Sequence, residues 1–422
     1  MENWKHVVLA DVLEEKGYIR GPFGSALKRN ELLSEGIPVY EQQHAIYNSR
    51  TFRFYINHEK FEEMKRFQVK ESDLIISCSG TVGKVSIIEK DDPKGIISQA
   101  LLLLRSNDKV IVPQYLKYFF ESREGYNSIV SRSSGSVQVN IARRNVIESI
   151  PLFLPPLNVQ KRIVGVLSSI DNPIKNNELI NQNLEQQAVL LFRSWFSNFS
   201  QSSSAPFKST ELGDIPSNFS VVKVGSLPML VTDYVANGSF ASLKENVTLY
   251  QEPNYAYFVR NTDLKSGSFG VYVDQHSYEF LSKSTLYGGE IIISNVGDVG
   301  SVFLCPKLNG PMTLGNNIIM LRPEDDALRY YLYIWFKHLQ GQALIQGIKG
   351  GSAQPKFNKT DFKNTPVILP PAELLSRFHD TVAPMFEAIS QNQAENTTLS
   401  NLRDTLLPRL MSGELDVSKL DL

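Results

Sequence analysis

The sequence contains the same pattern twice, with the second copy about 216 residues after the first. Asp-Leu-Ile-Ile-Ser at residues 73–77 returns as Glu-Ile-Ile-Ile-Ser at residues 290–294, an offset of 217. The turn Gly-Thr-Val-Gly at residues 80–83 returns as Gly-Asp-Val-Gly at residues 297–300, at the same offset. A repeat of this length is long enough to bury its own core, so it predicts two similar domains rather than a solenoid.

Composition limits the setting of these domains. The 422 residues are 42% hydrophobic and 21% charged, which is typical of a globular protein with more than one domain. No apolar run approaches the length that spans a bilayer, and the first residues lack the features of a signal peptide, so we expect a soluble, cytoplasmic protein. The net charge of −1 argues against nucleic-acid binding by bulk charge alone, although it leaves a local basic groove open.

The cysteines predict neither a disulfide framework nor a metal site. Cys78 and Cys305 are the two cysteines, and they stand at non-equivalent positions of the repeat. We expect both to be buried or half-buried thiols. His44 is expected to be a surface or hydrogen-bonded polar residue rather than a metal ligand.

Each copy divides into a mixed region and a helical region. Short apolar runs at residues 73–77 and 85–88 predict strands, and residues 112–122, with Pro113 in the first turn, predict an amphipathic helix. The expected fold class is therefore α+β. The expected division is a first globular domain over 1–156, a long helix over 157–200, a linker over 201–211, a second globular domain over 212–371, a second long helix over 372–413 and a tail over 414–422.

The two helical regions have the spacing of a coiled-coil seam, with steps of four and three residues. The first predicted seam is Ile163, Leu167, Ile170, Ile174, Asn177, Asn181, Leu184, Ala188, Leu191 and Trp195. The second is Phe378, Val382, Met385, Ile389, Asn392, Asn396, Leu399, Arg403, Leu406 and Leu410.

Each seam contains two asparagines at matched positions, which indicates layers that face each other and fix register. We therefore expect the helices to pair as an antiparallel coiled coil that holds the globular domains apart. The alternative is that Pro173 and Pro384 kink the helices and that the asparagines are solvated.

Three segments give the chain a resemblance to a known family. They are the proline-rich turn and Gln-Lys-Arg-Ile at 150–164, Leu-Gly-Asp-Ile-Pro at 212–216, and Leu-Arg-Asp-Thr-Leu-Leu-Pro-Arg-Leu-Met-Ser-Gly at 402–413. Together with the tandem repeat, these segments resemble the DNA specificity (S) subunit of Type I restriction-modification systems over the whole chain. The second copy departs from the pattern, because Leu-Ser-Arg-Phe at 375–378 replaces Gln-Lys-Arg-Ile.

The resemblance implies a DNA-recognition subunit without catalytic residues. Each globular region would be a target recognition domain that reads one half of a bipartite sequence in double-stranded DNA. The helices would set the gap between the halves and dock two modification (M) subunits, and restriction (R) subunits would complete the nuclease. No cofactor is expected in this chain, since S-adenosylmethionine, ATP and Mg²⁺ belong to the partner subunits, and no membrane is involved.

Direct readout of DNA requires side chains with hydrogen-bond donors and acceptors on loops. In the first domain the candidates are Arg20, Ser25, Lys28, Gln42, Gln43, Thr81, Lys84, Ser134, Ser136, Gln138, Asn140, Arg143 and Arg144. In the second domain they are Asn261, Asn295, Asp298, Asn316, Asn317, Lys349, Ser352, Gln354 and Lys356.

Structural alternatives exist for several of these candidates. Gln138 and Gln354 are equivalent in the repeat, which slightly favours a scaffold role, because two domains that read different bases need not share a base contact. Arg143 and Arg144 suit phosphate contacts, but they are also compatible with a solvated helix start. The segment from Gly80 to Lys84 is expected to be a tight turn between two strands whose tip reaches DNA.

Motifs of other function classes are missing from the sequence. Leu-Pro-Pro-Leu at 154–157 and Leu-Pro-Pro-Ala at 369–372 lack the polar and aromatic residues of an adenine methyltransferase motif, and Gly-Thr-Val-Gly-Lys-Val at 80–85 lacks the spacing of a phosphate-binding loop. A structural protein whose duplicated domains grip another protein is the rival interpretation, and a single-chain modification enzyme is a third. The rival does not account for shared framework motifs beside different loops.

Overall fold

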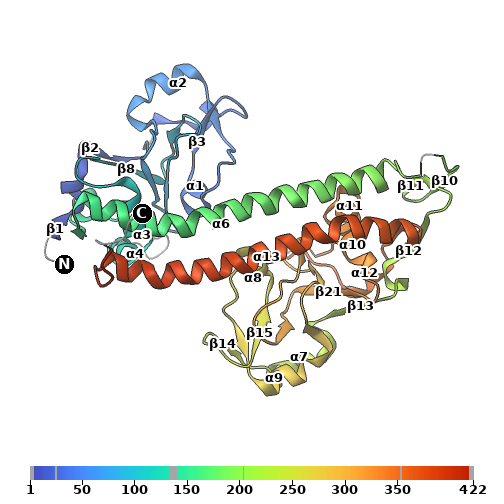
Figure 1. Ribbon diagram of the computed structural model, residues 1–422. Coiled ribbons are helices and arrows are strands. Elements are labelled where there is room, and N and C mark those ends of the chain that lie inside the picture. Colours follow the sequence, from blue (N-terminus) through green and yellow to red (C-terminus); the bar gives the residue numbers. More distant parts are fainter. Residues whose placement is uncertain (1–3, 24–25, 134–139, 203, 352–353, 418–422) are drawn as a thin grey trace. The chain divides into compact units, whose positions relative to one another are not determined.

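The structure, a computed structural model, describes residues 4–23, 26–133, 140–202, 204–351 and 354–417. The chain forms two compact units (Figure 1): unit 1 is Met1–Lys175 with Glu395–Leu422, and unit 2 is Asn176–Ala394. Each unit therefore contains one globular copy of the repeat and a part of both long helices, α6 (Leu157–Phe192) and α13 (Ala372–Met411). No helix of the described residues has the length and apolar character needed to cross a membrane.

Unit 1 is built on an antiparallel sheet in the order β2-β8-β5-β6, together with a sheet in the order β4-β3-β7 and the antiparallel pair β1–β9. Its strands are β1 (Lys5–Val8), β2 (Leu13–Arg20), β3 (Ile37–Tyr40), β4 (Tyr55–Ile56), β5 (Leu74–Ser77), β6 (Val85–Ile87), β7 (Ile96–Ile97), β8 (Leu101–Ser106) and β9 (Pro151–Leu154). Its helices are α1 (Gln42–Tyr47), α2 (His58–Glu63), α3 (Pro113–Glu121), α4 (Arg123–Val130) and α5 (Arg144–Glu148). The strands predicted at 73–77 and 85–88 and the helix predicted at 112–122 are confirmed as β5, β6 and α3.

Unit 2 repeats this plan with additions. An antiparallel sheet in the order β13-β21-β18-β19 corresponds to the first sheet of unit 1, and the order β16-β15-β20 corresponds to β4-β3-β7, with β14 and β17 added at its edges. Its strands are β10 (Phe207–Thr210), β11 (Gly213–Pro216), β12 (Ser220–Lys223), β13 (Met229–Asp233), β14 (Leu249–Tyr250), β15 (Ala256–Val259), β16 (Tyr272–Val273), β17 (Thr285–Leu286), β18 (Ile291–Ser294), β19 (Val302–Leu304), β20 (Met312–Leu314), β21 (Ile318–Pro323) and β22 (Pro366–Leu369). Its helices are α7 (Phe240–Asn246), α8 (Asn261–Ser266), α9 (Gln275–Phe280), α10 (Ala327–Lys337), α11 (Leu339–Gly347) and α12 (Lys359–Asn364).

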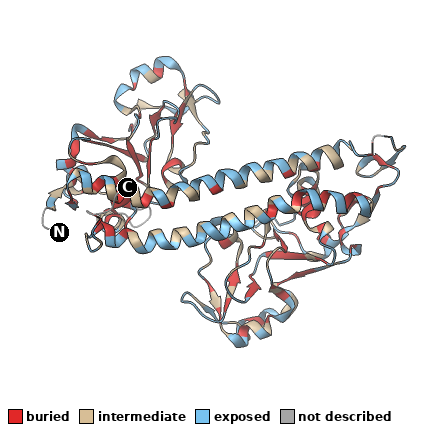
Figure 2. Ribbon diagram, viewed as in Figure 1, coloured by how far each residue is buried: buried red, intermediate tan, exposed pale blue. Residues whose placement is uncertain are grey.

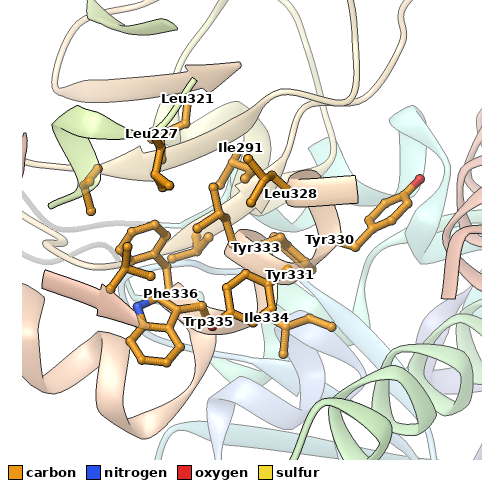
Figure 3. Packing of buried hydrophobic residues seen from close by; sticks show 14 of the residues in the cluster. Leu227, Ile291, Leu321, Leu328, Tyr330, Tyr331, Tyr333, Ile334, Trp335 and Phe336 are labelled. Atoms are coloured by element: carbon orange, nitrogen blue, oxygen red, sulfur yellow. The ribbon is translucent and has the colours of Figure 1, made fainter. Parts of the chain in front are cut away.

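The core of each unit includes residues of a long helix. In unit 1, Leu407, Leu410 and Met411 of α13 are buried in the same cluster as β5 and α3. In unit 2, the aromatic side chains of α10 pack together with Leu227, Ile291 and Leu321 (Figure 3), and Phe192 of α6 belongs to the same cluster. Because the helices contribute to these cores, they are integral parts of the units. Both cysteines are buried as expected, and burial raises the pKa of the Cys78 thiol to about 12.

The two long helices are paired, as expected, and the predicted seam residues up to Leu191 and Leu410 lie on them. Both helices continue through Pro173 and Pro384, and every seam residue is buried or half-buried. Figure 2 shows exposed residues along the outer faces of both helices. In unit 1, a guanidinium nitrogen of Arg403 lies 3.3 Å from Asp171 Oδ1, and Asn396 donates a hydrogen bond to the Ile174 carbonyl. The residue numbers on α13 fall as those on α6 rise, so the helices are antiparallel.

One asparagine pair forms the expected polar layer. In unit 2, Asn392 Nδ2 donates a hydrogen bond of 2.8 Å to Asn181 Oδ1. Farther along the same unit, Phe378 packs against Phe192 and Phe196, which repeats the antiparallel order. A polar layer in an otherwise apolar seam fixes the register of the pair, because shifting one helix would leave both amides unpaired.

The linker predicted at 201–211 differs from the structure. Residues 207–210 form β10, which pairs with β11 in an antiparallel hairpin, and Thr210 Oγ1 donates to the Gly213 carbonyl. Gly213 has a φ of +101°, which allows the tight connection. The polar composition of this segment suggested a linker, but its backbone pairs locally.

The Gln-Lys-Arg-Ile motif has a structural role through its glutamine. Gln160 is fully buried, and its amide donates to the carbonyls of Pro155 and Val110 while its oxygen accepts from the Val112 amide. This side chain ties the start of α6 to the segment before α3. The equivalent residue in unit 2 is Leu375, which is also buried, so an apolar contact replaces the polar one there.

Candidate nucleic-acid interface

In unit 1 several strands begin or end at one edge, so loops far apart in sequence lie together there. Gly21, just after β2, donates to the carbonyl of Leu101, the first residue of β8. The backbone amide of Cys78, just after β5, donates to the Ala100 carbonyl. The backbone amide of Ser98 donates to the carbonyl of Tyr40, the last residue of β3. We call this region the loop edge of unit 1; its described residues are 21–23, 26–28, 41–43, 78–84, 98–100 and 140–144.

The turn at 80–84 is a tight connection between β5 and β6, as predicted. Gly80 and Gly83 have φ values of +67° and +87°, which glycine adopts readily. Gly83 donates to the Ser77 carbonyl, and the Lys84 amide donates to Ser77 Oγ. Thr81 and Lys84 are exposed at the tip, with the Lys84 ammonium 4.9 Å from the centre of the Tyr126 ring. The turn therefore presents a hydroxyl and a cation on a fixed backbone.

Two candidate side chains brace this turn. Gln42 Nε2 donates to the Ser79 carbonyl at 2.6 Å, and the Ser79 amide donates to Gln42 Oε1 at 3.1 Å. Ser79 Oγ also donates to Asn140 Oδ1, and the Ile141 amide donates to the Cys78 carbonyl. Both polar atoms of the Gln42 amide are thus engaged within the protein, which makes Gln42 a brace for the loop rather than a free donor and acceptor.

Unit 2 has the same arrangement at equivalent positions. The backbone amide of Phe357 donates to the Asn295 carbonyl, just as the backbone amide of Ile141 donates to the Cys78 carbonyl in unit 1. The β-bridge between Val296 and Lys356 likewise matches the β-bridge between Ser79 and Asn140. The backbone amide of Asn295 donates to the Asn317 carbonyl, which ties the residue before β21 to the loop that follows β18. The loop edge of unit 2 has the described residues 234–239, 261–265, 295–301, 315–317, 349–351 and 354–357.

The side chains on this second scaffold are different. Asn295 Nδ2 donates to the Phe357 carbonyl, so Asn295 also serves as a brace. Asp298 accepts from Ser301 Oγ and lies 2.5 Å from the Lys265 ammonium, and these hydrogen bonds lower the pKa of Asp298. Lys265 was not among the candidates expected from the sequence. Lys265 lies on α8, the counterpart of α1, and α1 places Gln42 against the loop at 78–84, so the repeat was the signal that could have identified α8.

Comparisons with known proteins agree with this duplicated architecture. The sequence profile of the family described as "Type I restriction modification DNA specificity domain" matches residues 1–186 and 231–387. The chain belongs to this family. The first matched segment includes the globular part of unit 1, and the second begins within β13 of unit 2, so the family profile follows the repeat.

Individual relatives of this specificity chain cover most of its length. It is 27% identical over 376 residues to the Type I restriction enzyme MjaIX specificity subunit of Methanocaldococcus jannaschii, covering 83% of this chain and 81% of that one. It is 22% identical over 408 residues to the HindI specificity subunit of Haemophilus influenzae, covering 82% and 87%. The crystal structure of a Type I restriction-modification S subunit from M. genitalium has a TM-score of 0.54 at 16% identity, over 97% of this chain and 96% of that one, and shows the same fold. The chain is accordingly a DNA-recognition subunit and not an enzyme.

Two of the cationic candidates in unit 1 of the specificity chain contact neighbouring side chains. Arg144 pairs with Glu148 at 2.8 Å and lies over the Tyr18 ring, and Arg20 lies over the Phe23 ring. Lys28 and Arg143 are exposed, and Arg143 is the residue before the first turn of α5. Both arginines of the pair predicted at 143 and 144 are exposed, and Arg144 is also paired with Glu148 of its own helix.

The remaining candidates have simple placements. Gln43 Nε2 donates to the Thr51 carbonyl, and Lys349 Nζ donates to Gln346 Oε1. Asn261 is half-buried in the first turn of α8. Exposed side chains at the loop edge of unit 2 are Asn316, Asn317, Gln354 and Lys356. Five predicted candidates lie outside the described residues: Ser25, Ser134, Ser136, Gln138 and Ser352.

His44 is buried and hydrogen-bonded, so of the two expected placements, surface or hydrogen-bonded, the structure has the second. Its Nδ1 lies 2.7 Å from the Glu41 amide nitrogen and 3.0 Å from the Glu41 carbonyl oxygen, and its Nε2 lies 3.1 Å from the Thr51 carbonyl oxygen. The ring stacks on Phe52, and burial lowers the pKa of His44. Over the described part of the chain, no group of three or more His, Cys, Asp or Glu side chains is placed to hold a metal ion.

Proposed function

We propose that this chain recognises a bipartite DNA sequence, with unit 1 reading one half and unit 2 the other. The observation that carries the proposal is the pair of loop edges, which share a backbone scaffold and differ in their side chains. Cys78–Ile141 and Asn295–Phe357 form the same backbone hydrogen bond, whereas Thr81 and Lys84 at one turn are replaced by Asp298 and Ser301 at the other. A shared scaffold with different donors and acceptors is what two different half-sites require.

The paired helices set the gap between the half-sites in this proposal and dock two methyltransferase subunits. Supporting this role, Asn181 and Asn392 fix one register, and polar contacts connect the helices to the globular parts. In unit 1 the Tyr118 hydroxyl donates to Asp171 of α6. In unit 2 the Tyr333 hydroxyl and the Lys337 ammonium both contact Glu185 of α6 at 2.6 Å.

The partner subunits supply affinity and chemistry. With 43 basic and 44 acidic residues, the chain lacks the excess charge that holds a protein on phosphates, so we expect the isolated chain to bind DNA weakly. Methyltransferase subunits that bind S-adenosylmethionine would close around the duplex and methylate adenine. Restriction subunits that use ATP and Mg²⁺ would complete the nuclease.

The pattern of methylated adenines tests the proposal. DNA from cells that express this chain with its methyltransferase subunit is sequenced at the single-molecule level, against cells that express the methyltransferase alone. A gapped two-part motif that requires this chain supports the proposal. Absence of a motif, with the methyltransferase shown to bind the chain, would favour the structural-protein interpretation.

A domain exchange tests the division of labour. Replacing residues 206–370 by the corresponding segment of another specificity subunit should change one half of the motif and leave the other half and the gap length unchanged. A change in both halves would contradict the assignment of one half-site to each unit.

A further inference from the structure

The two units carry opposite charges at the end of one edge strand. Arg20 is the last residue of β2 and lies opposite Leu102 of β8, and Asp233 is the last residue of β13 and lies opposite Ile319 of β21. Leu102 and Ile319 are counterparts, because the offset of 217 between them also relates β5 to β18. The same place in the fold therefore holds a guanidinium in unit 1 and a carboxylate in unit 2.

In unit 2 the carboxylate is paired inside the protein. α12 begins at Lys359 and α5 begins at Arg144, and three residues later both helices have a fully buried apolar side chain, Phe362 in one and Ile147 in the other. Lys359 and Arg144 are therefore counterparts. Lys359 Nζ lies 2.9 Å from Asp233 Oδ1, so the cation at the start of α12 has its counter-ion at the end of β13.

In unit 1 the same place has donors without acceptors. Tyr18 precedes Arg20 by two positions, so both side chains lie on one face of β2. Tyr18 is 4% exposed, and within the part of the chain that the structure describes its hydroxyl and Arg20 Nη1 are both buried with no hydrogen-bond partner. The counterpart of Tyr18 in unit 2 is Val231, which has no polar atom to satisfy. A buried donor without a partner costs free energy, and here two of them neighbour each other.

The groups around these donors do not supply the missing acceptor. The Arg144 guanidinium lies 5.3 Å from the centre of the Tyr18 ring, and it pairs with Glu148, the one carboxylate of α5. The Cys78 thiol beside Arg20 stays neutral at pH 7, because burial raises its pKa to about 12. Two guanidinium groups therefore share one carboxylate, and among the described residues none serves as the counter-ion of Arg20.

We propose that Arg20, Arg144 and Tyr18 form a binding site for one phosphate group of the DNA backbone, and that unit 2 lacks this site because the Asp233 carboxylate takes the place of the phosphate. This inference rests on the proposed function. Arg20 is half-buried and the Arg144 side chain is 55% exposed, so a ligand at the loop edge of unit 1 reaches both. Two positive charges favour an anionic group over an uncharged base, and a guanidinium binds two phosphate oxygens at once. Unit 1 would then hold its half-site by a sequence-independent contact that unit 2 does not make.

The test uses the full chain in complex with its methyltransferase subunits, and it locates the phosphate directly. Each phosphate of the half-site read by unit 1, known from the domain exchange, is replaced in turn by an uncharged methylphosphonate. At one position the replacement should weaken binding of wild type by roughly 10- to 150-fold and leave binding of R20Q unchanged, because R20Q has already lost that contact. Losses that are additive with R20Q at every position overturn the inference.

The salt dependence distinguishes a phosphate contact from base reading. R20Q should reduce the slope of log affinity against log salt concentration by about 0.9, whereas R20K, which keeps the charge, should retain the slope. The methylation motif should be unchanged in both; lost discrimination at one base pair would show base reading and overturn the inference. The double variant D233N/K359Q is the matched control, since it removes one charge of each sign at the same place of unit 2, and its slope should equal that of wild type. A reduction as large as in R20Q would overturn the contrast between the units.

Y18F tests the buried hydroxyl. It removes a donor that has no partner in the free chain, so amide exchange in β2 of the free chain should slow, while affinity for the cognate duplex should fall by roughly 2- to 10-fold. Opposite effects on protection and on binding identify a group that awaits a ligand. Faster exchange together with weaker binding would show that the hydroxyl only supports the fold, and unchanged affinity would remove it from the site.

A titration with inorganic phosphate separates the two sources of this anion. If inorganic phosphate binds wild type and not R20Q in calorimetry, while both bind DNA alike, the site serves a free anion and the assignment to DNA is overturned. If the wild-type complex produces no two-part methylation motif, the proposed function fails. A normal motif with additive losses at every methylphosphonate means that this inference alone fails.

Discussion

Gln42 offers a sharp test of whether a candidate side chain reads bases or braces a loop. In Q42A the two hydrogen bonds to the Ser79 backbone are lost. A net contribution of about 0.5–1.5 kcal/mol for each bond gives a loss of about 1–3 kcal/mol in the free energy of closing the loop at 78–84. Because 1.4 kcal/mol corresponds to about tenfold in an equilibrium constant, the open state should become roughly 5- to 150-fold more populated.

Amide hydrogen exchange of the free chain measures this opening without DNA. The amides of Ser79, Gly83 and Ile141 are hydrogen-bonded within the loop and should exchange faster in Q42A by that factor. Q43A is the matched control: its amide makes one exposed bond of 3.3 Å to the Thr51 carbonyl, so exchange at these three amides should stay near wild type. Binding of the complex to its cognate duplex should weaken in Q42A with the methylation motif unchanged.

One combined result would refute this reasoning. If Q42A leaves the exchange of Ser79 and Ile141 as in wild type and the methylation motif loses a single base pair, then Gln42 leaves Ser79 on binding DNA and reads a base. The two hydrogen bonds to Ser79 would then contribute nothing measurable to closing the loop of the free chain.

Three further perturbations are expected to act on one unit each. Q160A should lower the free energy of unfolding of unit 1 by about 2–5 kcal/mol, because three backbone groups lose a buried partner, and exchange in β8 and α3 should rise while β21 and α10 stay unchanged. Burial lowers the pKa of His44, so the unfolded chain binds more protons than the folded chain as pH falls below about 6.5. The contribution of His44 to the free energy of unfolding is therefore present at pH 7 and is lost toward pH 5. Protection of the α1 amides from hydrogen exchange should fall over that pH range in wild type but not in H44Q. E185Q should lower the free energy of unfolding of unit 2 by about 1 kcal/mol, measured by urea denaturation, because Tyr333 keeps an acceptor, Lys337 loses its ion pair and the side chains are partly solvated. A loss in the opposite unit would contradict any of the three.

The repeat, the seams and the family could be read from the sequence because each depends on local spacing or on a contiguous motif. The apolar run of β5 and the heptad steps of α6 and α13 impose their structure wherever they occur. The asparagines at 181 and 392 could also be expected to face each other, since matched polar positions in two seams leave few other registers. The same local logic suggested a linker at 201–211, where pairing of β10 with β11 prevailed over polar composition.

The roles of the candidate side chains depended on the tertiary structure. Gln42 and Gln43 are adjacent and chemically identical, yet Gln42 braces Ser79 while Gln43 contacts Thr51. Ser79 and Asn140 meet across 61 positions of sequence. Hydrogen bonds between such distant residues are set by strand order and loop closure, which a local pattern does not specify.

The sequence by itself determined that this chain has two α+β copies, two pairing helices and the motifs of a DNA specificity subunit, because periodicity and motif spacing are properties of neighbouring residues. Only the tertiary structure decided that each compact unit includes parts of both long helices, and that Gln160 bonds buried backbone groups while its counterpart Leu375 belongs to the apolar core of unit 2. Burial and hydrogen-bond partners are collective results of packing, and they divide one list of polar candidates into braces and free surface groups.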